Sequence, residues 1–264
     1  MPRQPVAVPA SGDGIGGRGV SMAIPGHVLT SFQVDESQPL PLGPEWGNGV
    51  RFGRIVISEA PAHAAWSSKV REKVTVPGVR VARPVRSTDG RFTVAGFHAT
   101  DYVEGEPGHR VDEAISAALR FDDAVAYFPA PKLERNDVWA RADRAAWKGH
   151  LPQGKKLQVV HTDFLACCLF SGSLPPALTD FVPADSARPH GYSAALTLID
   201  GLLADAVDDA VLSRWSHVPD LIFMCERALD YREILNREFG GSSNIGSKIE
   251  CVRGLLVSGA DATL

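Results

Sequence analysis

The sequence predicts an α+β protein with two lobes, a β-rich N-lobe followed by a mainly helical C-lobe. Residues 25–101 hold several short runs rich in β-branched residues around a single helical pattern. Residues 108–264 are dominated instead by long helical patterns with Ala-rich interiors. Inside this second part, Asp163 and Asp180 each follow a short apolar run, which is typical of side chains presented at the ends of strands.

Composition limits the classes of function. The chain has 264 residues, enough for one large domain or two lobes, and its 44% hydrophobic and 22% charged residues are typical of a globular protein. Its net charge of −4 and the absence of any apolar run of 18 residues predict neither a nucleic-acid nor a membrane partner. The cysteines form no Cys-x-x-Cys pair, which favours a reduced, cytoplasmic protein. They are Cys167, Cys168, Cys225 and Cys251.

The N-terminal residues 1–24 are rich in Pro and Gly and lack periodicity, so we expect a disordered tail. Residues 12–17 fit the pattern Gly-x-Gly-x-x-Gly. A dinucleotide site needs that motif between a strand and a helix, and neither pattern flanks it here. We therefore expect no dinucleotide site in the tail.

The elements of the N-lobe, residues 25–101, follow in order. A short helix with an early Pro is expected first, then a Gly-rich turn, a strand, a second helix and two further strands, the last after a Ser-Thr-Asp-Gly turn. The expected ranges are 25–32, 43–49, 51–57, 60–74, 79–82 and 91–97. Residues 102–107 are expected to form the hinge to the next lobe.

The C-lobe, residues 108–264, contains helical patterns interrupted by two pairs of short strands. The expected helices cover 111–127, 136–148, 193–210, 220–239 and 245–257, and the strand pairs lie at 157–160 and 168–181. A strand-rich lobe, a hinge and a helical lobe that carries a small hairpin follow one another in the order found in kinases.

The two aspartates fit the same scheme. In kinases one Asp at a strand-to-loop turn accepts the proton of the attacking hydroxyl, and a second Asp holds Mg²⁺ against the ATP phosphates. Asp163, in the sequence His161-x-Asp163, and Asp180 have the matching spacing. The alternative for Asp163 is an aspartate that caps a turn. The kinase spacing also requires a metal-binding Asn at position 168, where Cys168 is a poor ligand for Mg²⁺ and is typical of a small buried hydrophobe.

Taken in order, these segments resemble the aminoglycoside phosphotransferase and choline kinase-like superfamily, and more closely an actinobacterial branch with altered ATP-site motifs. The resemblance covers about residues 25–235. It rests on the turn at 43–49, on residues 81–86, 102–105 and 142–147, and on His161, Asp163 and Asp180.

The resemblance implies a protein kinase-like fold that binds ATP and Mg²⁺ between its lobes and transfers phosphate to a small-molecule acceptor. It assigns Asp163 to the acceptor hydroxyl and Asp180 to the metal. The backbone of Gly43, Gly47 and Gly49 would cover the phosphates, and Glu104 would lie where adenine docks. A plain β-turn is the alternative for the Gly-rich segment, because bulky Pro44 and Trp46 interrupt it.

Two positions depart from the family pattern. Ser58 stands where the family has the Lys that reaches the phosphates, and Lys69 stands where a Glu would pair with that Lys. Lys69 either replaces the missing cation or is an ordinary solvated residue. An acidic run in the helical lobe either attracts a cationic substrate or forms a solvated face. The run comprises Asp200, Asp205, Asp208 and Asp209.

Two main functions therefore remain open, beside a third in which the same fold carries a thiol site at Cys167 or Cys168. One is a small-molecule phosphotransferase of weak or lost activity, since loss of one charge-stabilising group typically costs about 10²–10³ in rate. The other is a pseudokinase, a nucleotide-binding or protein-interaction module that acts through a protein partner. Whether the chain is an enzyme depends on how the ATP-handling residues are arranged.

Overall fold

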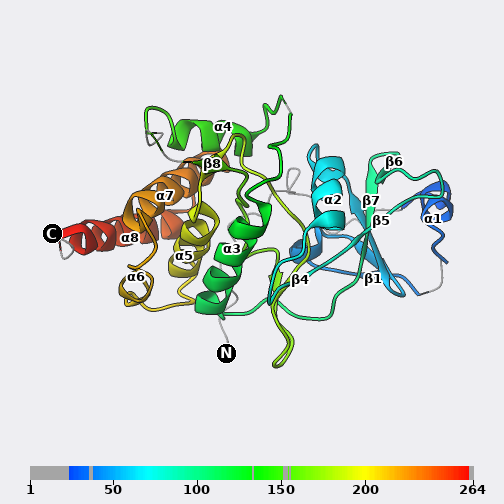
Figure 1. Ribbon diagram of the computed structural model, residues 1–264, viewed down its shortest axis with the longest axis horizontal. Helices are drawn as coiled ribbons and strands as arrows, with labels where there is room; N and C mark the ends of the chain where they lie inside the picture. Colours follow the sequence, from blue (N-terminus) through cyan, green and yellow to red (C-terminus); the bar gives the residue numbers. More distant parts are fainter. Residues whose placement is uncertain (1–23, 36–37, 133, 151–153, 155, 262–264) are drawn as a thin grey trace. The chain divides into compact units, whose positions relative to one another are not determined.

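The computed structural model describes residues 24–35, 38–132, 134–150, 154 and 156–261 (Figure 1). The predicted tail, apart from Ile24, lies outside these residues. The chain forms two compact units. The N-terminal unit comprises the described residues up to 107 together with 166–182, and the C-terminal unit comprises the described residues within 108–165 and 183–261.

The N-terminal unit is built on an antiparallel sheet with the strand order β1-β2-β3-β7-β5, and β6 also pairs with β7. Its strands are β1 (Leu40–Pro41), β2 (Val50–Phe52), β3 (Ile55–Glu59), β5 (Pro84–Val85), β6 (Thr93–Val94) and β7 (Phe97–Asp101). Three helical segments accompany the sheet: α1 (Gly26–Ser31), the 3₁₀ turn η1 (Pro44–Trp46) and α2 (Ala64–Lys73).

Two of the expected strands are each split by a turn. The range 51–57 becomes β2 and β3 because the chain reverses at Gly53, whose φ of 55° suits glycine. The range 91–97 becomes β6 and the start of β7, joined by Ala95 and Gly96 at positive φ. The predictions of continuous strands were wrong because neither turn interrupts the hydrophobic pattern.

Alternating side chains of the sheet enter two separate hydrophobic clusters. Ile57 packs with Val28, Leu29 and Phe32 from α1 and the residues after it. Its neighbour Val56 joins a different cluster, together with Trp46, Ala82, Leu169 and Ala177. Because successive side chains of a strand point to opposite faces, β3 separates the α1 side of the sheet from the side that carries Trp46.

A second, small sheet also belongs to the N-terminal unit. In it β10 (Ala177–Leu178) pairs antiparallel with β9 (Cys168–Leu169) and parallel with β4 (Arg80–Val81). Residues 166–182 were assigned to the C-lobe on sequence order. In the structure they belong to the N-terminal unit, because β10 pairs with β4 of that unit.

The C-terminal unit is mainly helical, with α5 packed beside α3 and α7, and α7 packed beside α4 and α8 (Figure 1). Its helices are α3 (Val111–Val125), α4 (Val138–Ala146), α5 (Tyr192–Leu203), α6 (Val211–Arg214), α7 (Leu221–Glu238) and α8 (Ser243–Asp261). The strands β8 (Leu157–Gln158) and β11 (Arg188–Pro189) pair antiparallel. None of the helices in the described part of the chain combines the length and apolar character needed to cross a membrane.

The predicted class, an antiparallel N-terminal part and a helical C-terminal part, is confirmed. The expected helix 193–210 ends earlier, at Leu203, and Asp205 follows it with a φ of 53° that a helix does not tolerate.

Candidate functional site

Asp180, the expected metal ligand, lies in the N-terminal unit among side chains of α2. Ser67 Oγ donates a hydrogen bond of 2.7 Å to Asp180 Oδ1, and Arg71 Nε lies 3.4 Å from the same oxygen. His63 Nε2 lies 3.7 Å from Asp180 Oδ2. Residues 63, 67 and 71 are four apart, so they form one face of the helix. Both carboxylate oxygens of Asp180 are therefore in contact with polar side chains of the chain itself.

Arg71 is fully buried and cross-links three parts of the unit. Besides approaching Asp180, its Nη1 donates to the carbonyls of Ala82, at 3.0 Å, and Thr179, at 2.9 Å. Burial opposes ionisation of Asp180, but the charge of Arg71 and the neighbouring His63 outweigh it, so the pKa of Asp180 lies well below its usual range. Asp180 is thus an ionised carboxylate whose charge is already balanced by a buried guanidinium.

The cation next to Asp180 is Arg71 rather than Lys69. Lys69 is exposed, whereas Arg71, two positions along α2, is buried. Residues two apart on a helix do not face the same way, so Lys69 does not lie on the face of α2 that carries Arg71. The sequence carries a signal for Arg71: it continues the i, i+3, i+4 series of small or apolar residues formed by Ala64, Ser67 and Ser68, where a charged residue is unusual.

Ser58 and Cys168, which stand where the family has a Lys and an Asn, are both buried. Ser58 is 6% exposed on β3, and its hydroxyl lies 2.9 Å from Nε2 of His98 on the paired strand β7. Burial lowers the pKa of His98 to about 4, so its imidazole is neutral near pH 7. Cys168 is 1% exposed on β9, which fits its interpretation as a small buried residue. All four cysteines are thiols rather than halves of disulfides.

The Gly-rich turn uses its backbone donors internally. The N–H groups of Trp46, Gly47, Asn48 and Gly49 donate to carbonyls of Gly43, Pro44, Gly43 and Trp46, respectively. The Gly43 N–H donates to Glu45 Oε1 at 3.2 Å. A phosphate at the predicted cradle of Gly43, Gly47 and Gly49 would have to displace these bonds. The segment is a compact turn around η1, the alternative that the sequence left open.

The hinge segment that was expected to receive adenine also forms hydrogen bonds within the N-terminal unit. The Glu104 carbonyl accepts a hydrogen bond of 3.0 Å from Arg80 Nη2. The next residues pair with β9, since the N–H and carbonyl of Glu106 both bond to the backbone of Phe170 at 2.9 Å. Gly105, with a φ of 150°, lies so close to β9 that an added Cβ would be 2.9 Å from Leu169 Cβ.

Asp163, the expected catalytic aspartate, belongs to the C-terminal unit. It is 8% exposed, and Arg232 Nη2 from α7 lies 3.5 Å from its Oδ1. The same guanidinium makes two bonds of 2.6 Å to Asp200 on α5 and one of 3.0 Å to the Thr162 carbonyl. Although burial favours the neutral form, Asp200 and Asp163 raise the pKa of Arg232 above its ordinary value. Sequence reasoning missed Arg232, which lies far from the motif that it contacts.

The loop before Asp163 is fixed by buried polar groups. Asp163 N–H donates to His161 Nδ1 at 3.0 Å, and His161 N–H donates to Ser193 Oγ at 2.8 Å. Ser193 in turn donates to Asp122, which also accepts from the Gly191 N–H. Burial raises the pKa of Asp122 to about 7, despite the hydrogen bond from Ser193. His161 thus has the structural role that the resemblance implied.

Comparison with known proteins identifies the fold. No protein-family model matches the sequence, and no curated protein matches it. The crystal structure of the aminoglycoside phosphotransferase from Alicyclobacillus acidocaldarius is similar over 94% of this chain and 98% of its own, with a TM-score of 0.58 and 16% identity. The chain has the aminoglycoside phosphotransferase fold. The GDP complex of aminoglycoside 2'-phosphotransferase-IIIa is similar over 90% of this chain and 97% of its own, with 14% identity and a TM-score of 0.49.

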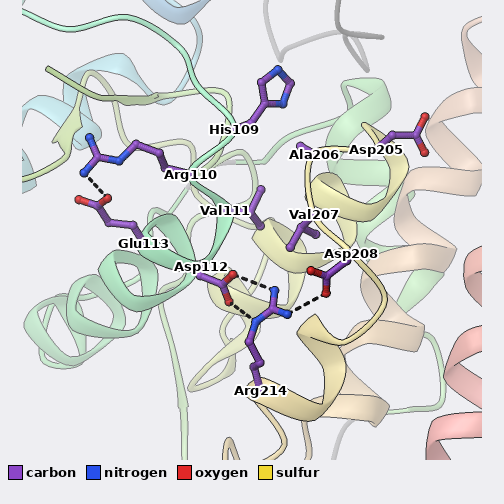
Figure 2. Close-up of a pocket in the computed structure, with 10 residues that line it drawn as sticks. All are labelled: His109, Arg110, Val111, Asp112, Glu113, Asp205, Ala206, Val207, Asp208 and Arg214. Atoms are coloured by element: carbon purple, nitrogen blue, oxygen red, sulfur yellow. Dashed lines mark hydrogen bonds and ion pairs between the residues drawn. The ribbon is translucent and has the colours of Figure 1, made fainter. Parts of the chain in front are cut away.

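In this phosphotransferase fold the acidic run of the C-terminal unit is largely neutralised. Asp200 pairs with Arg232, Asp205 pairs with Lys248 at 2.6 Å, and Asp208 pairs with Arg214 at 2.7 Å. Asp205 and Asp208 line an open hollow of about 730 Å³ together with residues 109–113. Figure 2 shows Arg214 bridging Asp208 and Asp112 across this hollow. The charges there satisfy one another, which favours the solvated-face alternative over a site for a cationic substrate.

The side chains around Asp180 fit a magnesium ion poorly, because those that contact its carboxylate are hydrogen-bond donors. Mg²⁺ requires oxygen ligands and tolerates little distortion, whereas Asp180 is flanked by a guanidinium, an imidazole and a hydroxyl that donates to it. Within the described ranges, no three His, Cys, Asp or Glu side chains gather so that they could hold a metal ion. A metal ion at Asp180 would have to compete with Arg71.

Proposed function

We propose that this protein is a pseudokinase with the aminoglycoside phosphotransferase fold, a binding module that does not transfer phosphate. The observation that carries the proposal is the pairing of Asp180 with the buried Arg71. Phosphoryl transfer depends on cations that neutralise the phosphates, chiefly Mg²⁺ held by this aspartate and the Lys of the N-lobe. Here the aspartate is neutralised by the chain, and Ser58 stands in place of the Lys.

The surrounding groups support the same proposal. The donors of the Gly-rich turn and the carbonyl of Glu104 already have hydrogen-bond partners in the N-terminal unit. A nucleoside triphosphate would have to break several of these bonds. We propose that the module works in the cytoplasm through a protein partner, the role assigned to a pseudokinase by the sequence.

The test is thermal unfolding of the full chain with millimolar ATP and Mg²⁺, alongside a phosphate-release assay. We expect no change in Tm and no release above the buffer rate. A bound nucleotide at about 100 times its Kd would add about 2.7 kcal/mol, which would raise Tm by several degrees. Asp180→Asn is the matched control, because it removes the only charge of the expected metal ligand.

A Mg²⁺-dependent rise in Tm that disappears in Asp180→Asn would overturn the proposal. It would favour the second candidate, a small-molecule phosphotransferase. The arrangement of Asp163 favours this candidate, because Arg232 lies 3.5 Å from its carboxylate and His161 accepts a hydrogen bond from its backbone N–H. Transfer to amino-sugar or amino-alcohol acceptors, lost in Asp163→Asn, would then establish catalysis.

A further inference from the structure

Asp122 is a carboxyl group enclosed in the core of the C-terminal unit. It lies on α3 with no exposed surface and bonds to the start of α5, the helix that packs beside α3 (Figure 1). Among the described residues, no Lys or Arg side chain contacts it. A buried carboxylate without a cation is costly. The closed structure around Asp122 therefore favours the neutral carboxyl.

Three elements fix the position of Asp122. Ser193 Oγ on α5 bonds to Oδ1 of the carboxyl, and the N–H of Gly191, at the start of the same helix, donates to Oδ2 at 3.0 Å. Gln158 on β8 donates to the backbone carbonyl of Asp122 at 2.6 Å. A protonated carboxyl keeps enough acceptor capacity for its two neighbours, so one closed arrangement accommodates both the neutral and the ionised group.

A continuous chain of hydrogen bonds joins Asp122 to the loop of Asp163. Ser193 Oγ, which is bound to Asp122, accepts the His161 N–H at 2.8 Å. His161 Nδ1 in turn accepts the Asp163 N–H at 3.0 Å. The His161 ring also lies edge-on to Phe121, the residue before Asp122, with 5.8 Å between the ring centroids. The backbone position of Asp163 therefore depends on Ser193, and that of Ser193 on Asp122.

The charged groups around Asp122 do not replace the missing cation. His190, in the segment that enters α5, pairs at 2.9 Å with Asp123, whose side chain is 73% exposed. Arg188 on β11 is bound to Asp143 instead. Burial outweighs both the hydrogen bonds that Asp122 accepts and the charge of His190, which raises the pKa of this carboxyl to about 7. Asp122 therefore changes its charge near neutral pH.

We propose that Asp122, acting through Ser193, is a positioning residue whose proton holds the loop of His161 and Asp163 closed. Opening of this region exposes the carboxyl to water, where its pKa returns to the ordinary value of 3.8. Between about pH 4 and pH 7 opening therefore releases a proton, and a rise in pH favours the open form by up to about tenfold per unit. Above pH 7 the closed form is ionised as well, so the effect ends there.

The inference goes beyond the proposed function and does not depend on it, because no nucleotide takes part. The test is amide hydrogen exchange of the full chain, followed by NMR at pH 5, 6, 7 and 8 and corrected for the intrinsic exchange rate at each pH. We expect the protection factors of His161 and Asp163 to fall by up to about tenfold per pH unit from pH 5 to pH 7 and then to level off.

In Asp122→Asn, which cannot ionise, these protection factors should not change with pH. Asp123→Asn is the matched control, because Asp123 is the exposed neighbour on the same helix. His190→Gln is the second control, since it removes the other group that titrates in this range. Both controls should keep the wild-type slope.

Ser193→Ala separates a positioning role from general stability. The Gly191 N–H still bonds directly to Asp122 in this variant, so its protection should keep the pH slope. The His161 N–H loses its acceptor, so its protection should decrease and become independent of pH.

Protection factors of His161 and Asp163 that do not vary with pH in the wild type would refute the proposal, as would an unchanged slope in a folded Asp122→Asn. An equal response of His161 and Gly191 in Ser193→Ala would refute it too, because exchange would then follow unfolding of the whole unit. This last comparison decides the matter if Asp122→Asn does not fold. Failure of the proposed function would appear instead as Mg²⁺-dependent binding of ATP, which these measurements do not involve.

Discussion

At the scale of single residues, the charge that decides the character of the site comes from one helix face. Lys69 and Arg71 lie two positions apart on α2, yet the lysine is exposed and the arginine is fully buried. The planar guanidinium of Arg71 satisfies an aspartate and two backbone carbonyls at once. A lysine ammonium has no such fork of donors and could not make the same set of bonds.

The buried carboxyl of Asp122 makes stability depend on pH. Its pKa of about 7 lies above the ordinary value of 3.8, so the folded chain retains a proton that the unfolded chain loses. Stability from this group is fully present below about pH 4 and is lost as pH rises through 7, with a slope of up to about 1.4 kcal/mol per pH unit.

We expect Asp122→Asn to remove this slope. Urea unfolding at pH 5, 6, 7 and 8 gives the free energy of unfolding of both proteins. The value for the variant should rise relative to that of wild type up to about pH 7, and the difference should stay constant above that pH. The exposed Asp209 serves as control, because Asp209→Asn should keep the wild-type slope. A constant difference between Asp122→Asn and wild type at all four pH values would contradict the raised pKa.

At the scale of elements, the close approach of the hinge to β9 organises the N-terminal unit. The backbones of Glu106 and Phe170 exchange hydrogen bonds, and Gly105 contacts Leu169 and Phe170 without a side chain of its own. The approach requires glycine on two grounds, a φ of 150° and the lack of space for a Cβ.

Gly105→Ala should therefore be more destabilising than an alanine placed at positive φ in open space. We expect a loss of about 2–4 kcal/mol, from backbone strain together with overpacking. Gly53→Ala is the control: its φ is 55°, but nothing lies within 4 Å of the added Cβ, so it should cost only about 1–2 kcal/mol. Denaturant unfolding gives both values, and equal losses would show that the contact with β9 is unimportant.

At the scale of the whole molecule, the chain leaves the N-terminal unit near residue 107 and re-enters it for residues 166–182. The returning segment supplies β9 and β10. It also supplies Leu169 and Ala177, which belong to the same hydrophobic cluster as Trp46, and the Thr179 carbonyl that accepts a hydrogen bond from Arg71. The unit is therefore complete only when both segments are present.

We expect a fragment of residues 24–107 to lack a cooperative thermal transition. The same fragment joined through a flexible linker to residues 166–182 should recover one, because β10 again pairs with β4. Circular dichroism during heating distinguishes the two. Cooperative unfolding of the shorter fragment alone would show that the returning segment is dispensable.

The sequence by itself determined the order of the elements, the two-part α+β class and the positions of the two aspartates, since these follow from local periodicity and spacing. It also marked Ser58 and Cys168 as departures from the ATP-handling pattern. Only the tertiary structure decided which cation lies beside Asp180, which carbonyls accept hydrogen bonds from the N–H groups of the Gly-rich turn, and which ring stacks on Tyr102. Those contacts join residues such as Arg71 and Thr179, 108 positions apart, or Glu45 and Thr179, 134 apart, and no local pattern encodes such pairs.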